Sequence, residues 1–142
     1  MDEAVLEARR GIEIGHGGPF GAVIVRGDTV LASAHNEVLS RNDPTAHAEI
    51  LAIRAAAAAI ASPHLDGCTL YTTCEPCPMC LAAIHWARLE RVVYAETRQN
   101  AAKIGFDDER FHDAMNRPLM PIEHVPDKGA ATLFAEYVGK RY

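Results

Sequence analysis

The chain has no excess of basic residues and no long apolar run. Its 142 residues include 14 Lys and Arg against 19 Asp and Glu, which gives a net charge of −5. A large nucleic-acid-binding face normally requires a basic excess, so this composition argues against a nucleic-acid partner. No run of about eighteen apolar residues is present, so we expect neither a transmembrane helix nor a membrane partner.

The start of the sequence and its few cysteines indicate neither a secretory leader nor a disulfide framework. It starts Met-Asp-Glu, without the positive charge and apolar stretch typical of a leader. Of only four cysteines, Cys74, Cys77 and Cys80 lie within one short cluster. Clustered cysteines indicate a metal site rather than a disulfide framework, and free thiols fit a reducing compartment. We therefore expect a cytoplasmic protein.

The length and the apolar content predict one domain, over residues 1–142, with a substantial core. Hydrophobic residues make up 49% and charged residues 23% of the chain, which is typical of an α/β domain. Residues 20–36 resemble a β-hairpin, and the strand, helix and strand over 69–95 predict a parallel pair. We expect a three-layer α/β/α sandwich with a mixed sheet of about five strands. The expected helices cover 2–15, 46–60, 78–87, 109–116 and 132–138, and the fifth strand covers 120–125.

Three residues offer the donor atoms of a catalytic zinc site. His47, Cys77 and Cys80 supply one imidazole and two thiolates, and catalytic zinc takes three protein ligands and leaves a fourth position for water. Pro78 suits the first turn of a helix, which places Cys77 at the helix start. With Thr45 as the N-cap of the helix over 46–60, His47 also lies at a helix start. Two helix N-termini are therefore expected to converge on one zinc ion.

Glu49 distinguishes an enzyme from a structural zinc site. Residues i and i+2 of a regular helix do not share a face, so His47 and Glu49 both reach the metal only at an irregular first turn. A carboxylate in that position transfers protons between water and substrate. The alternative is a closed structural site that includes Cys74, in a zinc-stabilised interaction module. We interpret Cys74 and Cys68 as buried thiols instead.

His47-x-Glu49 followed by Pro76-Cys77-x-x-Cys80 is the signature of the zinc-dependent nucleobase deaminases. The chain resembles the cytidine-deaminase-like superfamily and, within it, is most similar to the bacterial guanine deaminases. The segment 106–108, Phe-Asp-Asp, and the terminal Tyr142 are the features that point to guanine. The matching stretches are 17–25, 42–49, 71–88 and 104–108.

The resemblance implies hydrolytic deamination of guanine to xanthine and ammonia, with one zinc ion bound by His47, Cys77 and Cys80. Glu49 would shuttle protons, and the partner is a small-molecule purine. The resemblance also implies a homodimer that exchanges the C-terminal helix and tail, residues 127–142, between subunits. The further contacts that it implies are Asn36, Phe20 and the Ala48 backbone N–H with the purine, Asp108 with the departing amino group, and Tyr142 over the partner's site.

Four of these contacts have a structural alternative. Asn36 suits a turn cap, Phe20 the core, Asp108 a helix N-cap and Tyr142 a frayed tail. Alternative activities are guanosine, transfer-RNA adenosine and cytosine deamination. The transfer-RNA enzymes usually have Leu at the position of Cys74. We interpret the alanine run 55–59 as helix filler, His85 as a packing residue, and Trp86 as core or interface.

Overall fold

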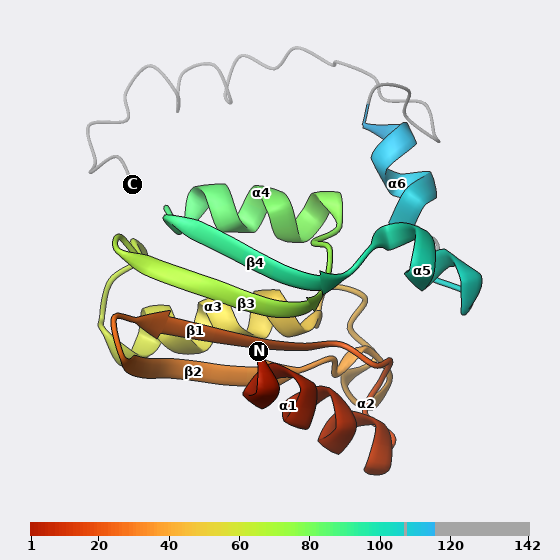
Figure 1. Ribbon diagram of the computed structural model, residues 1–142, viewed down its shortest axis with the longest axis horizontal. Helices are drawn as coiled ribbons and strands as arrows, with labels where there is room; N and C mark the ends of the chain where they lie inside the picture. Colours follow the sequence, from red (N-terminus) through yellow and green to blue (C-terminus); the bar gives the residue numbers. More distant parts are fainter. Residues whose placement is uncertain (107, 116–142) are drawn as a thin grey trace, which may run out of the picture.

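A computed structural model describes residues 1–106 and 108–115 (Figure 1). The predicted fifth strand and the predicted C-terminal helix lie outside these residues. The helices are α1 (Asp2–Glu13), α2 (Val38–Arg41), α3 (Ala48–Ala59), α4 (Pro78–Trp86), α5 (Arg98–Lys103) and α6 (Asp108–Ala114). The strands are β1 (Gly21–Arg26), β2 (Thr29–His35), β3 (Cys68–Cys74) and β4 (Arg91–Glu96).

The four described strands form one mixed sheet in the order β2-β1-β3-β4. β1 pairs antiparallel with β2 and with β3, whereas β3 and β4 are parallel and are connected through α4. Helix α1 lies on one side of the sheet, and α3 and α4 lie on the other (Figure 1). The three-layer α/β/α architecture and the parallel pair are confirmed.

A stripe of small residues determines how α3 packs on the sheet. Ala48, Ala52 and Ala56 are fully buried and pack in one cluster with Ala22 and Ile24 of β1. Their spacing of four residues places them on one face of the helix. Without longer side chains between them, the helix and the sheet approach closely. The alanine run is therefore not simple filler, because Ala56 belongs to the core.

Local details correct two predictions and narrow a third. His47, and not Thr45, is the N-cap residue of α3, because the Thr45 hydroxyl donates to Asp43 Oδ1 at 2.7 Å. His85 is exposed and does not pack in the core. Trp86 is 68% exposed in this chain, which excludes the core and leaves the interface interpretation.

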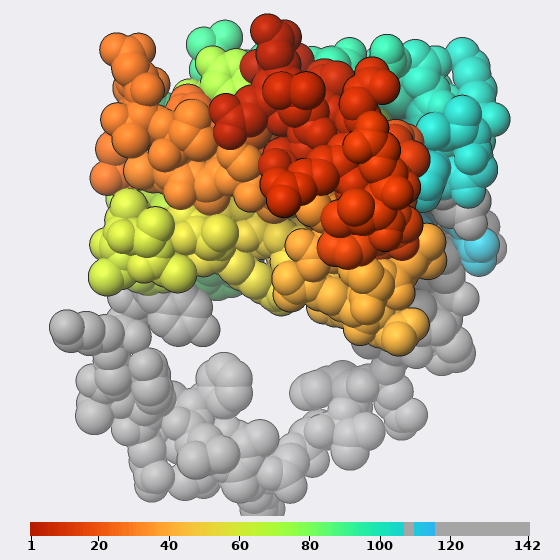
Figure 2. Space-filling view, turned by 90° about the horizontal axis from the view of Figure 1, so that it is seen from below, coloured from red at the N-terminus to blue at the C-terminus, as the bar shows by residue number. Residues whose placement is uncertain are grey.

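The segment that follows α1 is held by α2. The backbone N–H groups of Leu39 and Ser40 donate to the carbonyl oxygen of His16 at 3.0 and 3.2 Å. The space-filling view shows the gold surface around α2 beside the orange-red surface that follows α1 (Figure 2). In the part of the chain that the structure describes, no helix has the length and hydropathy needed to span a membrane.

Candidate active site

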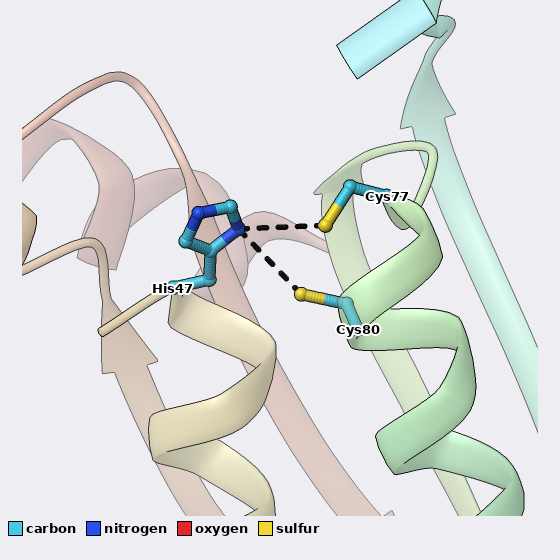
Figure 3. Close-up of side chains that lie close together, drawn as sticks. All are labelled: His47, Cys77 and Cys80. Atoms are coloured by element: carbon cyan, nitrogen blue, oxygen red, sulfur yellow. Dashed lines mark hydrogen bonds between the residues drawn. The ribbon is translucent and has the colours of Figure 1, made fainter. Parts of the chain in front are cut away.

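The N-termini of α3 and α4 bring His47, Cys77 and Cys80 together (Figure 3). His47 and Cys77 are the N-cap residues of these helices and have extended backbones, with ψ values of 151° and 167°. Cys80 is the third residue of α4, one turn beyond Cys77, and Pro78 occupies the first turn as predicted. The starts of two helices therefore converge in the structure, as the sequence predicted.

The spacing of the three donor atoms fits a shared metal ion. His47 Nδ1 lies 3.7 Å from Cys77 Sγ and 3.6 Å from Cys80 Sγ. A tetrahedral zinc, with Zn–S near 2.3 Å and Zn–N near 2.0 Å, holds sulfur and nitrogen ligands about 3.6 Å apart. Cys74 is not among the converging donors, and its thiol donates to the Thr97 carbonyl oxygen at 3.8 Å. Among the residues that the structure describes, the donor set is that of an open site with three protein ligands.

The electrostatics of the cysteine pair favour a thiolate at Cys77 and a thiol at Cys80. A hydrogen bond from the Cys80 thiol lowers the pKa of Cys77 to about 4. The same contact, together with burial, raises the pKa of Cys80. The two sulfur atoms thus share one proton, which a metal ion displaces when it binds to both of them.

Glu49 is buried, and its carboxyl group lines the cavity that His47 and Cys77 also line. It is the second residue of α3, and Thr72 of β3 donates to its Oε1 at 3.4 Å. Burial raises the pKa of Glu49, because a carboxylate loses hydration there. His47 and Glu49 both line the cavity because His47 precedes the regular helix. Thr72 was missed from the sequence, although its position in β3, two residues beyond the buried Leu70, places it on the same face.

A cavity of about 480 Å³ opens in front of these groups. Phe20 and Phe106 meet edge to face in its wall, with ring centroids 4.7 Å apart. Gly17 and Gly18 form one rim, and a Cβ atom at Gly17 would lie 2.0 Å from Asn36 Oδ1. Two residues without side chains thus allow the backbone to approach Asn36 and the aromatic wall. The full lining is Gly17, Gly18, Phe20, Asn36, Val38, Leu39, His47, Glu49, Cys74, Glu75, Cys77, Phe106 and Phe111.

The remaining predicted site residues are placed as follows. Asn36 is buried in the cavity wall, where its Oδ1 accepts a hydrogen bond from the Val38 N–H at 3.2 Å, so it also caps the turn. Phe20 both lines the cavity and packs against the core. Ala48 is the first residue of α3. Asp108 is the first residue of α6, but its side chain lies outside the described part of the structure, as does Tyr142.

Glu75 was also missed from the sequence. It lines the cavity and accepts hydrogen bonds from the backbone N–H of Arg98 at 3.2 Å and from its guanidinium at 2.6 Å. This pair joins the loop that precedes α4 to the start of α5. No motif signals it, because Arg98 is distant in the sequence and reaches Glu75 only through the parallel pairing of β3 and β4.

Comparison with known proteins defines the class. The cytidine and deoxycytidylate deaminase zinc-binding region matches residues 1–96, and the chain belongs to this family. It is therefore a zinc-dependent deaminase. The guanine deaminase of Bacillus subtilis (strain 168) is 49% identical over 118 residues, covering 83% of this chain and 76% of that protein. A crystal structure of guanine deaminase from Bacillus subtilis superimposes with a TM-score of 0.91 and 41% identity, over 99% of this chain and 94% of that one.

Two further relatives show the range of the family. A tRNA-specific adenosine deaminase of Aquifex aeolicus (strain VF5) is 45% identical over 138 residues, covering 96% of this chain and 90% of that protein. A crystal structure of the protein NE0047 in complex with 2,6-diaminopurine has a TM-score of 0.71 and 33% identity, over 75% of this chain and 60% of that one. The predicted fold and the predicted zinc cofactor are confirmed by these family relationships.

Proposed function

We propose that the chain catalyses the hydrolytic deamination of guanine to xanthine and ammonia. The observation that carries the proposal is that a single cavity joins the donor set His47, Cys77 and Cys80, the buried carboxyl of Glu49 and an aromatic wall. The similarity to a guanine deaminase supports guanine as the substrate, and the diaminopurine complex of a relative supports a 2-amino purine.

His47, Cys77 and Cys80 hold the zinc ion, which when bound lowers the pKa of water and so supplies a nucleophile near neutral pH. Glu49 accepts a proton from the attacking water and passes it to a ring nitrogen. The water oxygen forms a bond to carbon 2, and the bond from carbon 2 to the exocyclic nitrogen breaks. Glu49 also assists transfer of the second water proton to the departing amine, which leaves as ammonia. All atoms of guanine and water appear in xanthine and ammonia.

The other cavity residues orient the purine. Because Asn36 Oδ1 is engaged by Val38, its amide N–H groups are the part that donates to the purine edge. Phe20 and the Ala48 backbone N–H contact the ring, and Asp108 contacts the amino group. The apolar rings of the wall exclude water, which strengthens these polar interactions.

Adenosine deamination in transfer RNA is the second candidate, because the Aquifex aeolicus relative is similar over almost the whole chain. Two features favour guanine. The net charge is −5, which is unfavourable for an RNA-binding face. In addition, Cys74 occupies the position that is usually Leu in the transfer-RNA enzymes.

The test is ammonia release over a panel of guanine, guanosine, cytosine, cytidine, adenine, ammeline and folded transfer RNA. We expect guanine to give the highest kcat/KM and transfer RNA to be inert. Glu49→Ala is the matched control. Its turnover of guanine should fall about 10²–10⁴-fold or more, because a general acid–base group is lost. Higher activity on guanosine or on transfer RNA would reassign the substrate, and near-normal turnover by Glu49→Ala would exclude the mechanism.

We further propose a cytoplasmic homodimer in which residues 127–142 are exchanged and Tyr142 covers the partner's cavity. Three apolar side chains on α4 and β4 support an interface, because Leu81, Trp86 and Tyr94 are 42%, 68% and 47% exposed. The free cysteines fit a reducing cytoplasm.

A further inference from the structure

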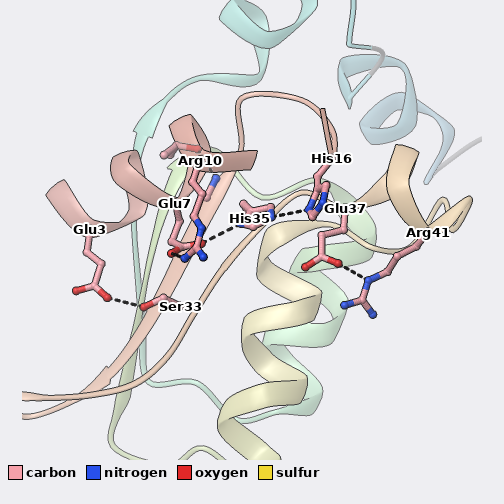
Figure 4. A network of polar contacts seen from close by, with 10 residues as sticks. Glu3, Glu7, Arg10, His16, Ser33, His35, Glu37 and Arg41 are labelled. Carbon is pink, nitrogen blue, oxygen red and sulfur yellow. Dashed lines mark hydrogen bonds and ion pairs between the residues drawn. The ribbon is translucent and has the colours of Figure 1, made fainter. Parts of the chain in front are cut away.

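A second cluster of metal-binding side chains lies outside the zinc site. His16, His35 and Glu37 each offer one donor atom, and these atoms lie within 4.8 Å of one another. They come from the segment after α1, the end of β2 and the start of α2 (Figure 4). Nothing in the proposed deamination uses them. Two imidazoles and one carboxylate form a donor set that binds zinc in other proteins, with positions left for water.

His35 is oriented as metal-binding histidines usually are. Its Nδ1 lies 2.9 Å from Glu7 Oε2, so Nδ1–H donates to the carboxylate and the lone pair is on Nε2. A carboxylate behind a histidine fixes the tautomer and raises the basicity of the other nitrogen. That nitrogen faces His16 Nδ1 at 3.0 Å (Figure 4). The orientation of His35 is thus set by Glu7 of α1, before any ion binds.

Gly11 provides the space for this arrangement. It is buried within α1, and a Cβ atom there would lie 2.8 Å from the His35 ring. Glycine inside a helix costs roughly 0.5–1 kcal/mol relative to alanine, so this position is unfavourable for helix stability alone. The His35 ring gains close contact with α1 in return, which brings its Nδ1 to Glu7.

The other two candidate ligands are also held in place. Arg41 Nε donates to Glu37 Oε2, which leaves the second carboxylate oxygen to bind a cation. The carbonyl oxygen of His16 accepts the two hydrogen bonds from α2, and its N–H donates to the Gly11 carbonyl oxygen at 2.9 Å. A cavity of about 430 Å³ is lined by Glu7, His35, Glu37 and Arg41 and provides a path for entry.

We propose that His16, His35 and Glu37 form a second metal site, which binds a divalent transition-metal ion such as Zn²⁺. Imidazole and carboxylate ligands suit ions of this class. Zinc bound at 2.0–2.1 Å holds two nitrogen ligands about 3.3–3.4 Å apart. The two histidines therefore separate by only a few tenths of an ångström, and the proton on His16 Nδ1 is exchanged through solvent to Nε2 of the same ring, which stays neutral.

The site joins α1, β2 and α2 directly behind the cavity rim. Gly17 and Asn36, which line the cavity, each follow a proposed ligand by one residue. A bound ion would fix the positions of both rim residues. The second site is therefore structural, and its occupancy is measured by metal content and thermal stability, independently of turnover.

The experiment is equilibrium dialysis of the holoenzyme against buffered Zn²⁺, with bound zinc per chain measured by mass spectrometry. We expect a second equivalent at higher free Zn²⁺, accompanied by a rise in Tm. His16→Ala and Glu37→Gln should lose the second equivalent and keep the first. Glu7→Gln should weaken the second binding step about 10–100-fold, which is the usual effect of losing the carboxylate behind a histidine ligand.

His85→Ala is the matched control, because His85 is exposed and far from the cluster in sequence, and it should bind both equivalents. Imidazole ¹⁵N chemical shifts of the intact chain give a second measurement that does not require a variant. They should move for His16 and His35 as the second equivalent binds. A single equivalent at saturation, or a second one unaffected by His16→Ala and Glu37→Gln, would overturn the proposal. The contacts among His16, His35 and Glu7 would then be hydrogen bonds without a metal-binding role.

Discussion

At the scale of single residues, Cys74 and Cys77 differ in where they lie on the secondary structure. Cys74 ends β3, and its thiol donates to the Thr97 carbonyl oxygen. Cys77 caps α4, where the start of the helix favours thiolate and the sulfur faces His47. The two thiols are three residues apart in the sequence, but only Cys77 belongs to the converging donor set.

Cys77→Ser should therefore lose the zinc of the candidate active site, whereas Cys74→Ser should retain it. A serine hydroxyl is a poor replacement for a thiolate ligand, and Cys74 has another role at the end of the strand. Zinc content of the purified variants, measured after dialysis against low free Zn²⁺, checks the prediction. Loss of this zinc from Cys74→Ser alone would favour the closed structural site.

The residue-scale chemistry was predictable where it depends on short sequence distances. The His-x-Glu and Cys-x-x-Cys spacings, with Pro78 at the helix start, led to the converging donors that the structure contains. Thr72 and Glu75 were not predicted, because Thr72 reaches Glu49 only after α3 packs on β3. Glu75 meets Arg98 only after β3 and β4 pair. Neither contact leaves a local signal in the sequence.

At the scale of elements, α3 connects core packing to the site. Its buried alanines set the distance to the sheet, and its first turn carries His47 and Glu49. The apolar patterns predicted α1, α3, α4, α6 and the four described strands, whereas α2 and α5 were not among the expected helices. The burial of Ala56 could not be predicted, since a run of five identical residues has no internal pattern.

Ala56→Leu should destabilise the protein by about 1–3 kcal/mol, because a larger side chain overpacks the contact between α3 and the sheet. Ala55→Leu is the matched control, since Ala55 is exposed and leucine is also a good helix former, and its effect should stay within about 0.5 kcal/mol. Urea unfolding of the two variants measures the difference. Equal stabilities would contradict the assignment of the helix face.

At the scale of the whole molecule, the order of the elements fixed the three-layer architecture in advance, because a strand, helix and strand in succession favour a parallel pair. The identity of the substrate could not be predicted from the composition or from the zinc ligands. It depends on the cavity lining, which is gathered from the segment before β1, the end of β2, α3 and the loop after α5. The exchanged dimer was predicted from the resemblance and from the pattern of the C-terminal residues, and it requires a test with two different chains.

Two inactive variants should restore activity to each other if residues 139–142 act on the partner's cavity. Glu49→Ala and a chain that ends at Val138 are each expected to be nearly inactive. After subunit exchange, the truncated chain of a mixed dimer keeps Glu49 and receives a complete tail from its partner. Random exchange of equal amounts should restore about a quarter of the wild-type sites, because half of the dimers are mixed and each has one complete site.

Native mass spectrometry of the mixture checks that exchange has occurred, and Tyr142→Ala serves as a second tail variant if truncation impairs folding. Mixed dimers without recovered turnover would exclude a tail that acts on the partner subunit. Full activity of both tail variants alone would remove Tyr142 from the reaction. Recovery with Tyr142→Ala in place of the truncated chain would assign the effect to the aromatic ring itself, because that variant retains the backbone of the tail and lacks only the side chain.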